Sequence, residues 1–145
     1  MNIPLVSASL TICEKVLLES DGVRSLIRIV DLFSVGPPIP NLPEEIQVLE
    51  ITVAGFFRLQ PDDDSVRSVE LHLIRPSGEE RLIGVVSEMS APPNEHGSPR
   101  GFWLQAQFGL VPSEMGVHYL SAKMENIEVA RAHLTLVRKQ IEPAS

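Results

Sequence analysis

Alternation of apolar and polar side chains along short segments is the feature that most constrains what this chain can form. Apolar residues occupy mainly the odd positions of 49–59, and the same period of two recurs over 102–110. Successive side chains of a strand point to opposite faces, so the pattern predicts strands with one face in a core. The predicted inward positions are Leu49, Ile51, Val53, Phe57 and Leu59, followed by Phe102, Leu104, Ala106, Phe108 and Leu110.

Further strands are predicted between turn signals, over residues 5–13, 69–73, 81–88, 117–124 and 128–138. Turns are marked by Ser20-Asp21-Gly22 and Pro76-Ser77-Gly78-Glu79, because glycine tolerates a positive φ and small polar side chains bond the local backbone. Four prolines within residues 36–43 lack the N–H that a strand ladder needs. That segment is therefore predicted to be a crossover.

Residues 23–35 fit two interpretations. A helical stripe would contain Val23, Leu26, Ile27, Val30 and Phe33, with Asp21 as its N-cap. The valine and isoleucine content and the preceding turn favour a strand instead. With this strand, about eight strands are predicted. The 145 residues fit a single domain over 1–145. We therefore expect an all-β fold with little helix, a single antiparallel β-sandwich of Ig-like or C2-like type.

The charge and the cysteine content restrict which partners the chain is expected to bind and in which compartment it is expected to work. Nineteen acidic against twelve basic residues give a formal charge of −7, which repels nucleic acid and anionic lipid on average. We therefore expect no nucleic-acid partner and no membrane partner. Cys13 is the only cysteine, so an intramolecular disulfide is excluded. No apolar run approaches the ~20 residues of a membrane span, and no basic leader precedes Lys15. These features predict a cytoplasmic protein.

Most of the common catalytic signatures are missing from the sequence. It contains no P-loop, no Rossmann glycine motif and no Gly-x-Ser-x-Gly elbow. Residues 97–101 resemble the elbow only superficially, because Ser98 stands one place too early and Pro99 follows it. The prediction is therefore that the chain is not an enzyme. A hydrolase that uses His96 and Ser98 of the long 89–100 loop remains the alternative.

Metal sites and cofactors are likewise not expected. Glu70 and His72 are two residues apart on a predicted strand and share a face, but zinc requires three or four ligands. The acidic loop Asp62-Asp63-Asp64 lacks the spacing of an EF-hand. Cys13 ends an apolar strand with no nucleophile signature around it, which favours a packing role.

One candidate contact face emerges from the last strands. A hairpin turning at Glu125-Asn126-Ile127 sets Tyr119 opposite His133, Ser121 opposite Arg131 and Lys123 opposite Val129. On the preceding predicted strand Trp103, Gln105 and Gln107 point outward. Trp, Tyr and Arg often carry interface energy. The predicted binding residues are Trp103, Gln105, Gln107, Tyr119, Arg131 and His133, and an ordinary sheet exterior is the alternative.

Both ends of the chain resemble a known family. Residues 12–16, Ser20-Asp21-Gly22 and residues 26–31 resemble the opening of a family of small uncharacterised bacterial β-sandwich proteins, and residues 116–119 with the Glu125-Asn126 turn resemble its end. That family usually has glycine where this chain has Asn126, and asparagine also tolerates a left-handed φ. The resemblance implies a β-sandwich of bacterial or phage origin and no catalytic residue.

Together these observations favour a non-enzymatic binding or assembly module whose partner is another protein or a second copy of the chain. The alternatives are a structural or accessory protein of a phage-like particle and the hydrolase described above.

Overall fold

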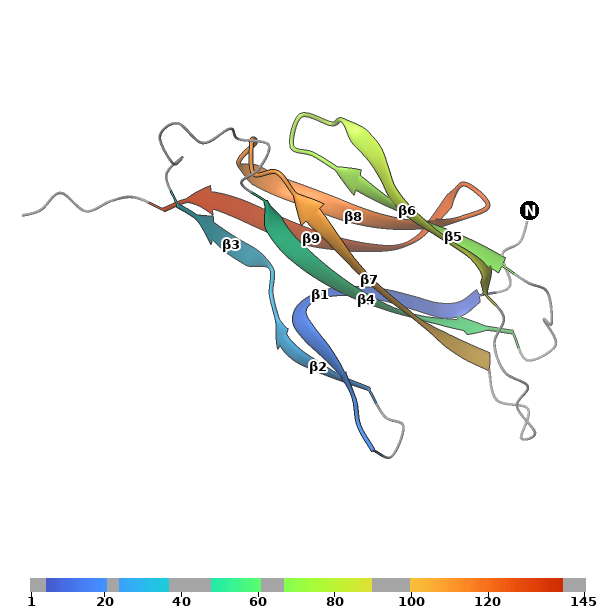
Figure 1. The fold of residues 1–145 in the computed structure, drawn as a ribbon. Helices are drawn as coiled ribbons and strands as arrows, with labels where there is room; N and C mark the ends of the chain where they lie inside the picture. Colours follow the sequence, from blue (N-terminus) through green and yellow to red (C-terminus); the bar gives the residue numbers. More distant parts are fainter. Residues whose placement is uncertain (1–4, 21–23, 37–47, 61–66, 90–99, 140–145) are drawn as a thin grey trace, which may run out of the picture.

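The computed structural model describes residues 5–20, 24–36, 48–60, 67–89 and 100–139. Over these residues the chain forms nine strands and no helix (Figure 1). The strands are β1 (Leu5–Leu18), β2 (Arg24–Ile29), β3 (Leu32–Val35), β4 (Leu49–Leu59), β5 (Arg67–Ile74), β6 (Glu80–Met89), β7 (Arg100–Leu110), β8 (Gly116–Met124) and β9 (Ile127–Arg138). The predicted all-β fold is confirmed, and the strand interpretation of 23–35 holds over β2 and β3.

The strands form two sheets. The four-stranded sheet has the order β2-β1-β4-β7, and the five-stranded sheet has the order β3-β9-β8-β5-β6. Every described pair is antiparallel except β3 with β9, which is parallel, so the expectation of a purely antiparallel fold is wrong at this edge. The reason is the short link Val30-Asp31, which carries the chain from β2 directly to the edge beside β9. There Asp31 accepts a backbone hydrogen bond from Thr135.

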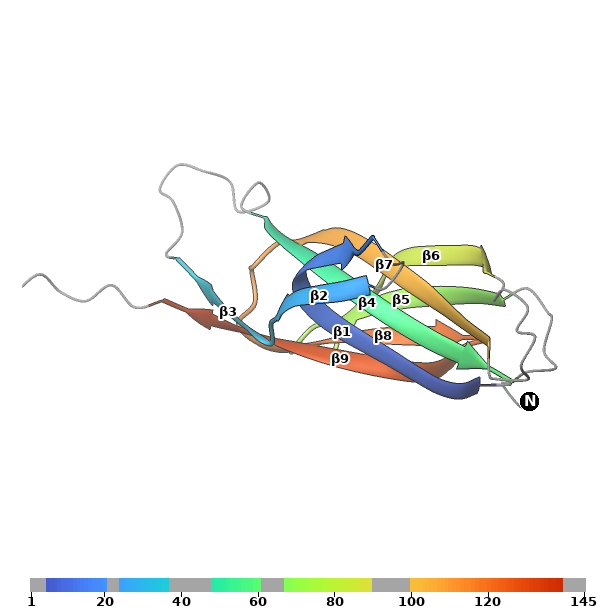
Figure 2. The same cartoon turned by 90° about the horizontal axis from the view of Figure 1, so that it is seen from below.

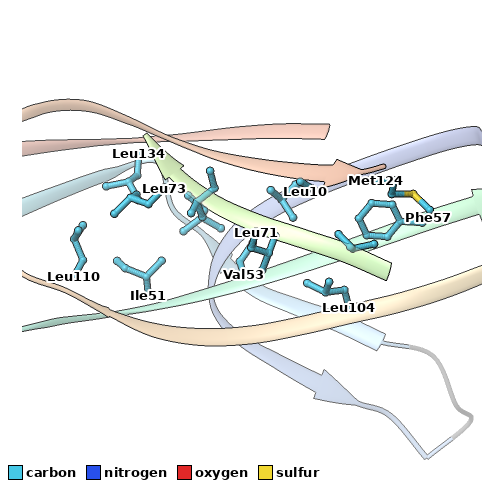
Figure 3. Packing of buried hydrophobic residues seen from close by; sticks show 14 of the residues in the cluster. Leu10, Ile51, Val53, Phe57, Leu71, Leu73, Leu104, Leu110, Met124 and Leu134 are labelled. Atoms are coloured by element: carbon cyan, nitrogen blue, oxygen red, sulfur yellow. The ribbon is translucent and has the colours of Figure 1, made fainter. Parts of the chain in front are cut away.

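The core lies between the two sheets, where apolar side chains of both meet (Figure 3). Ile51, Val53 and Phe57 of β4 are fully buried, as their alternation predicts. Opposite them lie Leu71 and Leu73 of β5, together with β8 and β9 side chains, in one continuous cluster. Phe57 stacks on Phe102 with ring centroids 5.2 Å apart. Burial of this apolar area is the main force that joins the sheets.

The final hairpin agrees with the predicted register except near its turn. Tyr119 pairs with His133 and Ser121 pairs with Arg131, as expected. Lys123 pairs with Glu128 and not with Val129, because a bulge follows Ala122. The turn contains only Glu125 and Asn126, with φ values of 51° and 65°. Two consecutive residues with positive φ form a two-residue turn whose twist matches that of the flanking strands. The chain therefore forms this turn and not the expected three-residue loop.

Several predictions fall outside the described residues. They concern the acidic loop at 62–64, most of the proline-rich crossover and the long loop that contains His96 and Ser98. The structure therefore does not bear on the hydrolase alternative. In the described part of the chain no helix is long and apolar enough to cross a membrane.

His118 is the one described side chain that leaves a buried polar atom without a partner. It is fully buried on β8; its Nδ1 lies 3.1 Å from the carbonyl oxygen of Gly116, while Nε2 has no hydrogen-bond partner. Burial lowers the pKa of His118, and the Arg75 charge acts in the same direction. The Gly116 carbonyl and Glu114 oppose that shift. The imidazole is therefore held neutral in the folded protein.

This burial predicts acid-sensitive stability. Because the folded pKa of His118 is below the unfolded value of about 6.5, the unfolded chain binds more protons as the pH falls. The free energy of unfolding should therefore hold above about pH 6.5 and decline below it. Denaturant unfolding of wild type and His118→Leu between pH 7.5 and pH 5 should show a smaller decline in the variant. His133→Gln, at an exposed position, is the matched control, and equal pH slopes in all three proteins would contradict this role.

Candidate binding face

The six predicted binding residues lie on two different sheets. Trp103, Gln105 and Gln107 belong to β7 at the edge of the four-stranded sheet, whereas Tyr119, Arg131 and His133 belong to β8 and β9 of the other sheet. They do not share one face, because β7 pairs with β4 and has no pairing with β8. The molecule therefore has two outer faces to compare.

The outer face of the five-stranded sheet carries a set of mutually paired polar groups. The guanidinium of Arg131 lies 4.7 Å from the ring centroid of Tyr119 and donates to Glu128, with Nε–Oε1 at 2.9 Å. Glu128 also accepts a 2.5 Å hydrogen bond from the hydroxyl of Ser121, which is fully buried. The hydrogen bonds from Arg131 and Ser121, in that order, lower the pKa of the Glu128 carboxyl.

Two further carboxylates, Glu80 and Glu70, extend this network across β5 and β6. Lys123 donates to Glu80 at 2.7 Å and lowers the pKa of that carboxyl. Nε2 of His72 lies 3.3 Å from Oε2 of Glu70, so these two side chains share a face as their spacing predicts. Across the described residues, no three His, Cys, Asp or Glu side chains come close enough to hold a metal ion. The charges of this face are thus largely satisfied by one another.

The outer face of the four-stranded sheet carries a pair of aromatic rings. Phe56 of β4 and Trp103 of β7 are direct partners in the ladder, and their centroids are 4.9 Å apart with an interplanar angle of 46°. Both side chains are half-buried. Ser9 continues the same row on β1. The two rings therefore form a short aromatic row across the sheet.

Two arginines flank these rings. The Arg24 guanidinium carbon lies 5.3 Å from the Trp103 ring centroid, and that of Arg58 lies 5.1 Å from the Phe56 centroid. Both distances are in the range of a cation–π contact. We call this set of four side chains, Arg24, Trp103, Phe56 and Arg58, the aromatic–arginine row. The order along the row is cation, ring, ring, cation.

Arg24 reaches Trp103 because the β1–β2 hairpin leaves the plane of the sheet. Figure 1 shows the end of β1 and all of β2 turning away from β4 and β7, and Figure 2 shows them crossing over that sheet in projection. The Arg24–Trp103 contact places the end of the hairpin against the outer face. Burial of the outward-facing Thr52 and Ala54 agrees with this overhang.

Glycine at position 101 lets the ring of Phe56 approach the backbone of β7 closely. A Cβ atom at this position would come within 2.5 Å of Cζ of Phe56. The ring therefore occupies the space that the Cβ atom of any other residue at position 101 would fill. This arrangement ties the orientation of Phe56 to a residue on the neighbouring strand.

The surroundings of the row are polar and mostly uncharged. Gln107 donates to the hydroxyl of Thr52 at 3.2 Å, and Gln105 is exposed. Among the described outward positions of β4 and β7 the one acidic side chain is Glu50, at the opposite end of β4 from the rings. Among these outward positions the charged residue nearest the rings is therefore the cation Arg58, although the chain as a whole is acidic.

The sequence did not identify Phe56, Arg58 or Arg24 as binding residues of this face. The signal for Phe56 is the adjacent pair Phe56-Phe57, since neighbouring residues of a strand point to opposite faces and only one can enter the core. Arg24 has no comparable local signal, because its position depends on the path of the hairpin.

Comparisons with known proteins give few relatives. No family model and no curated protein matches the chain. Among solved structures it is similar to the alkylpurine DNA glycosylase AlkC of Pseudomonas fluorescens, bound to DNA that contains an abasic-site analogue. That match has 9% identity and a TM-score of 0.44, and it covers 88% of this chain but 30% of the glycosylase chain. Likeness at this level assigns no activity to this chain. Membership of the small bacterial β-sandwich family stays a prediction.

Two expectations are not carried forward. The chain was expected to be a non-enzymatic binding or assembly module, with a protein or a second copy as partner and no nucleic acid. The structural neighbour is instead an enzyme in complex with DNA, at a likeness that transfers neither its activity nor its ligand to this chain. The charge argument behind the second expectation averaged over the whole chain, whereas recognition depends on how rings and cations are arranged locally.

The Ser121–Glu128 contact yields a stability prediction. Glu128→Ala should lower the free energy of unfolding by about 1–3 kcal/mol, because it leaves the buried Ser121 hydroxyl without its acceptor. Urea denaturation measures this loss. Adding Ser121→Ala to Glu128→Ala should recover part of it, since the unpaired hydroxyl is then removed. Strictly additive losses in the double variant would contradict the coupling.

Proposed function

We propose that the outer face of the four-stranded sheet binds nucleic acid by stacking bases on Phe56 and Trp103. The observation that carries this proposal is the aromatic–arginine row, in which two ring faces at the surface are each flanked by a guanidinium group. Aromatic side chains on a sheet face accept bases of any sequence, because every base has a π-face.

The arginines fit the same ligand in two ways. A guanidinium plane stacks on a base as it now stacks on a ring, and its N–H groups donate to phosphate oxygens. Arg24 and Arg58 both have exposed side chains, so each can rotate from ring to ligand without disturbing the core. Exposed Gln105 adds a donor and an acceptor for base edges beside Trp103.

The net charge of −7 restricts the mode of binding. A surface that tracks many phosphates needs a stripe of cations, and the described residues hold no such stripe on either sheet. Stacking depends on ring area and not on total charge, at about 1–3 kcal/mol per base. An acidic protein with two neighbouring aromatic rings on one face is therefore suited to bind nucleic acid through the bases of the ligand.

Removing either ring should weaken binding. Trp103→Ala and Phe56→Ala should each reduce affinity for a labelled ten-nucleotide single strand by roughly 5- to 150-fold, the equivalent of one lost base stack. Fluorescence anisotropy measures the affinity.

Tyr119→Ala is the matched control, since Tyr119 also lies under an arginine but on the other sheet. It should bind as wild type does. Equal affinities of wild type and both ring variants, with melting temperatures showing that all are folded, would contradict the proposal, as would the absence of binding in wild type.

A further inference from the structure

The geometry of the ring pair restricts which form of nucleic acid fits, an inference that rests on the proposed function. We infer that the face takes unpaired nucleotides, about two at a time, and does not take duplex. Phe56 and Trp103 are tilted by 46° to each other. A base stacked on each ring would inherit that tilt, whereas neighbouring bases of a duplex lie parallel. Only a strand whose bases are splayed apart satisfies both rings.

The length of the site follows from the ends of the row. Arg24 covers Trp103 and Arg58 covers Phe56, so the row ends in a cation on each side. The row thus contains two rings, each with a guanidinium over it. Two bases, one stacked on each ring in place of its arginine, therefore fill the row. The next outward positions on β4 and β7 beyond Phe56 and Trp103 in the direction of Glu50 are Ala54 and Gln105, which offer no further ring.

The overhanging hairpin disfavours a duplex on this face. Its end contacts Trp103 through Arg24, so a rigid double helix laid across both rings would meet the hairpin. A flexible single strand passes beside the hairpin where a duplex does not.

Salt dependence provides a separate measure. With Arg24 and Arg58 as the cations beside the rings, about two phosphates are neutralised, and for single strands the slope of log affinity on log salt is then about −1.4. Raising the salt from 50 to 200 mM should weaken binding roughly 7-fold. A protein that makes 6–10 phosphate contacts on duplex loses about 10³–10⁵-fold over the same range.

The chain provides its own probe for the experiment. Trp103 is its only tryptophan, so intrinsic fluorescence reports on the site directly. The ligands are deoxyadenosine monophosphate, the dinucleotide and decanucleotide of deoxyadenosine, and a 20-base-pair duplex. We expect the single strands to quench the fluorescence. The dinucleotide should bind at least tenfold more tightly than the mononucleotide, and the decanucleotide should gain little more than a statistical factor. The duplex should bind at least tenfold more weakly than the single strands.

The outcomes separate this inference from the proposal beneath it. Duplex binding as tight as that of the single strands, or a salt effect above 100-fold, would overturn the inference while leaving nucleic-acid binding in place. Equal affinity for mono- and dinucleotide would overturn the two-base site and indicate a free-nucleotide ligand. Absence of quenching and of anisotropy change with every ligand would remove the proposed function itself, and this inference with it. Tyr119→Ala should repeat the wild-type series.

Discussion

The alternation of side chains along β4 is the constraint on which both the core and the outer face depend. Ile51, Val53, Phe57 and Leu59 have no exposed area, so their parity is fixed by the core. β4 is paired on both sides, with β1 and with β7, and a slip of one residue would turn every inward side chain outward. The same register therefore buries Phe57 and presents Phe56 beside Trp103.

Local patterns predicted most of the strands, and they failed where the answer depends on distant parts of the chain. The alternation over 49–59 and 102–110 identified β4 and β7 with the correct inward residues, and the final hairpin was predicted with the correct register except next to its turn. Local patterns did not predict which strands share a sheet. Whether β7 lies beside β8 or beside β4 depends on pairings between segments far apart in the chain, which no local period encodes. Trp103 and Tyr119 were grouped on one face for that reason.

The two outer faces also differ in how their charges are used. On the five-stranded sheet Arg131, Lys123 and His72 each face a carboxylate, so their donors are engaged within the protein. On the four-stranded sheet Arg24 and Arg58 face ring systems, and neither is paired with a carboxylate of the described residues. An acidic total charge is therefore compatible with a face whose cations are not paired with carboxylates in the described part of the chain. The count of charges alone cannot distinguish the two faces.

The position of Arg24 depends in turn on a strained residue of the hairpin. Arg28 has a φ of 50° and lies between the registered pairs Cys13–Ile29 and Lys15–Ile27, where the hairpin bends out of the sheet. A left-handed conformation costs a residue with a Cβ about 1–2 kcal/mol. The exposed Arg28–Glu14 ion pair, at 3.2 Å, contributes at most about 1 kcal/mol.

Further stabilisation therefore has to come from the packing of the bent hairpin. Val16 and Leu26 are paired across the hairpin and share the parity of Arg24, the side chain that meets the sheet; both are half-buried. Strained backbone persists where the surrounding structure over-determines it. The left-handed conformation of Arg28 forms the bend, and the bend places Arg24 against Trp103. The position of Arg24 at the end of the aromatic–arginine row therefore depends on a backbone conformation several residues away. The hairpin is for that reason a structural part of the face and not an independent edge of the sheet.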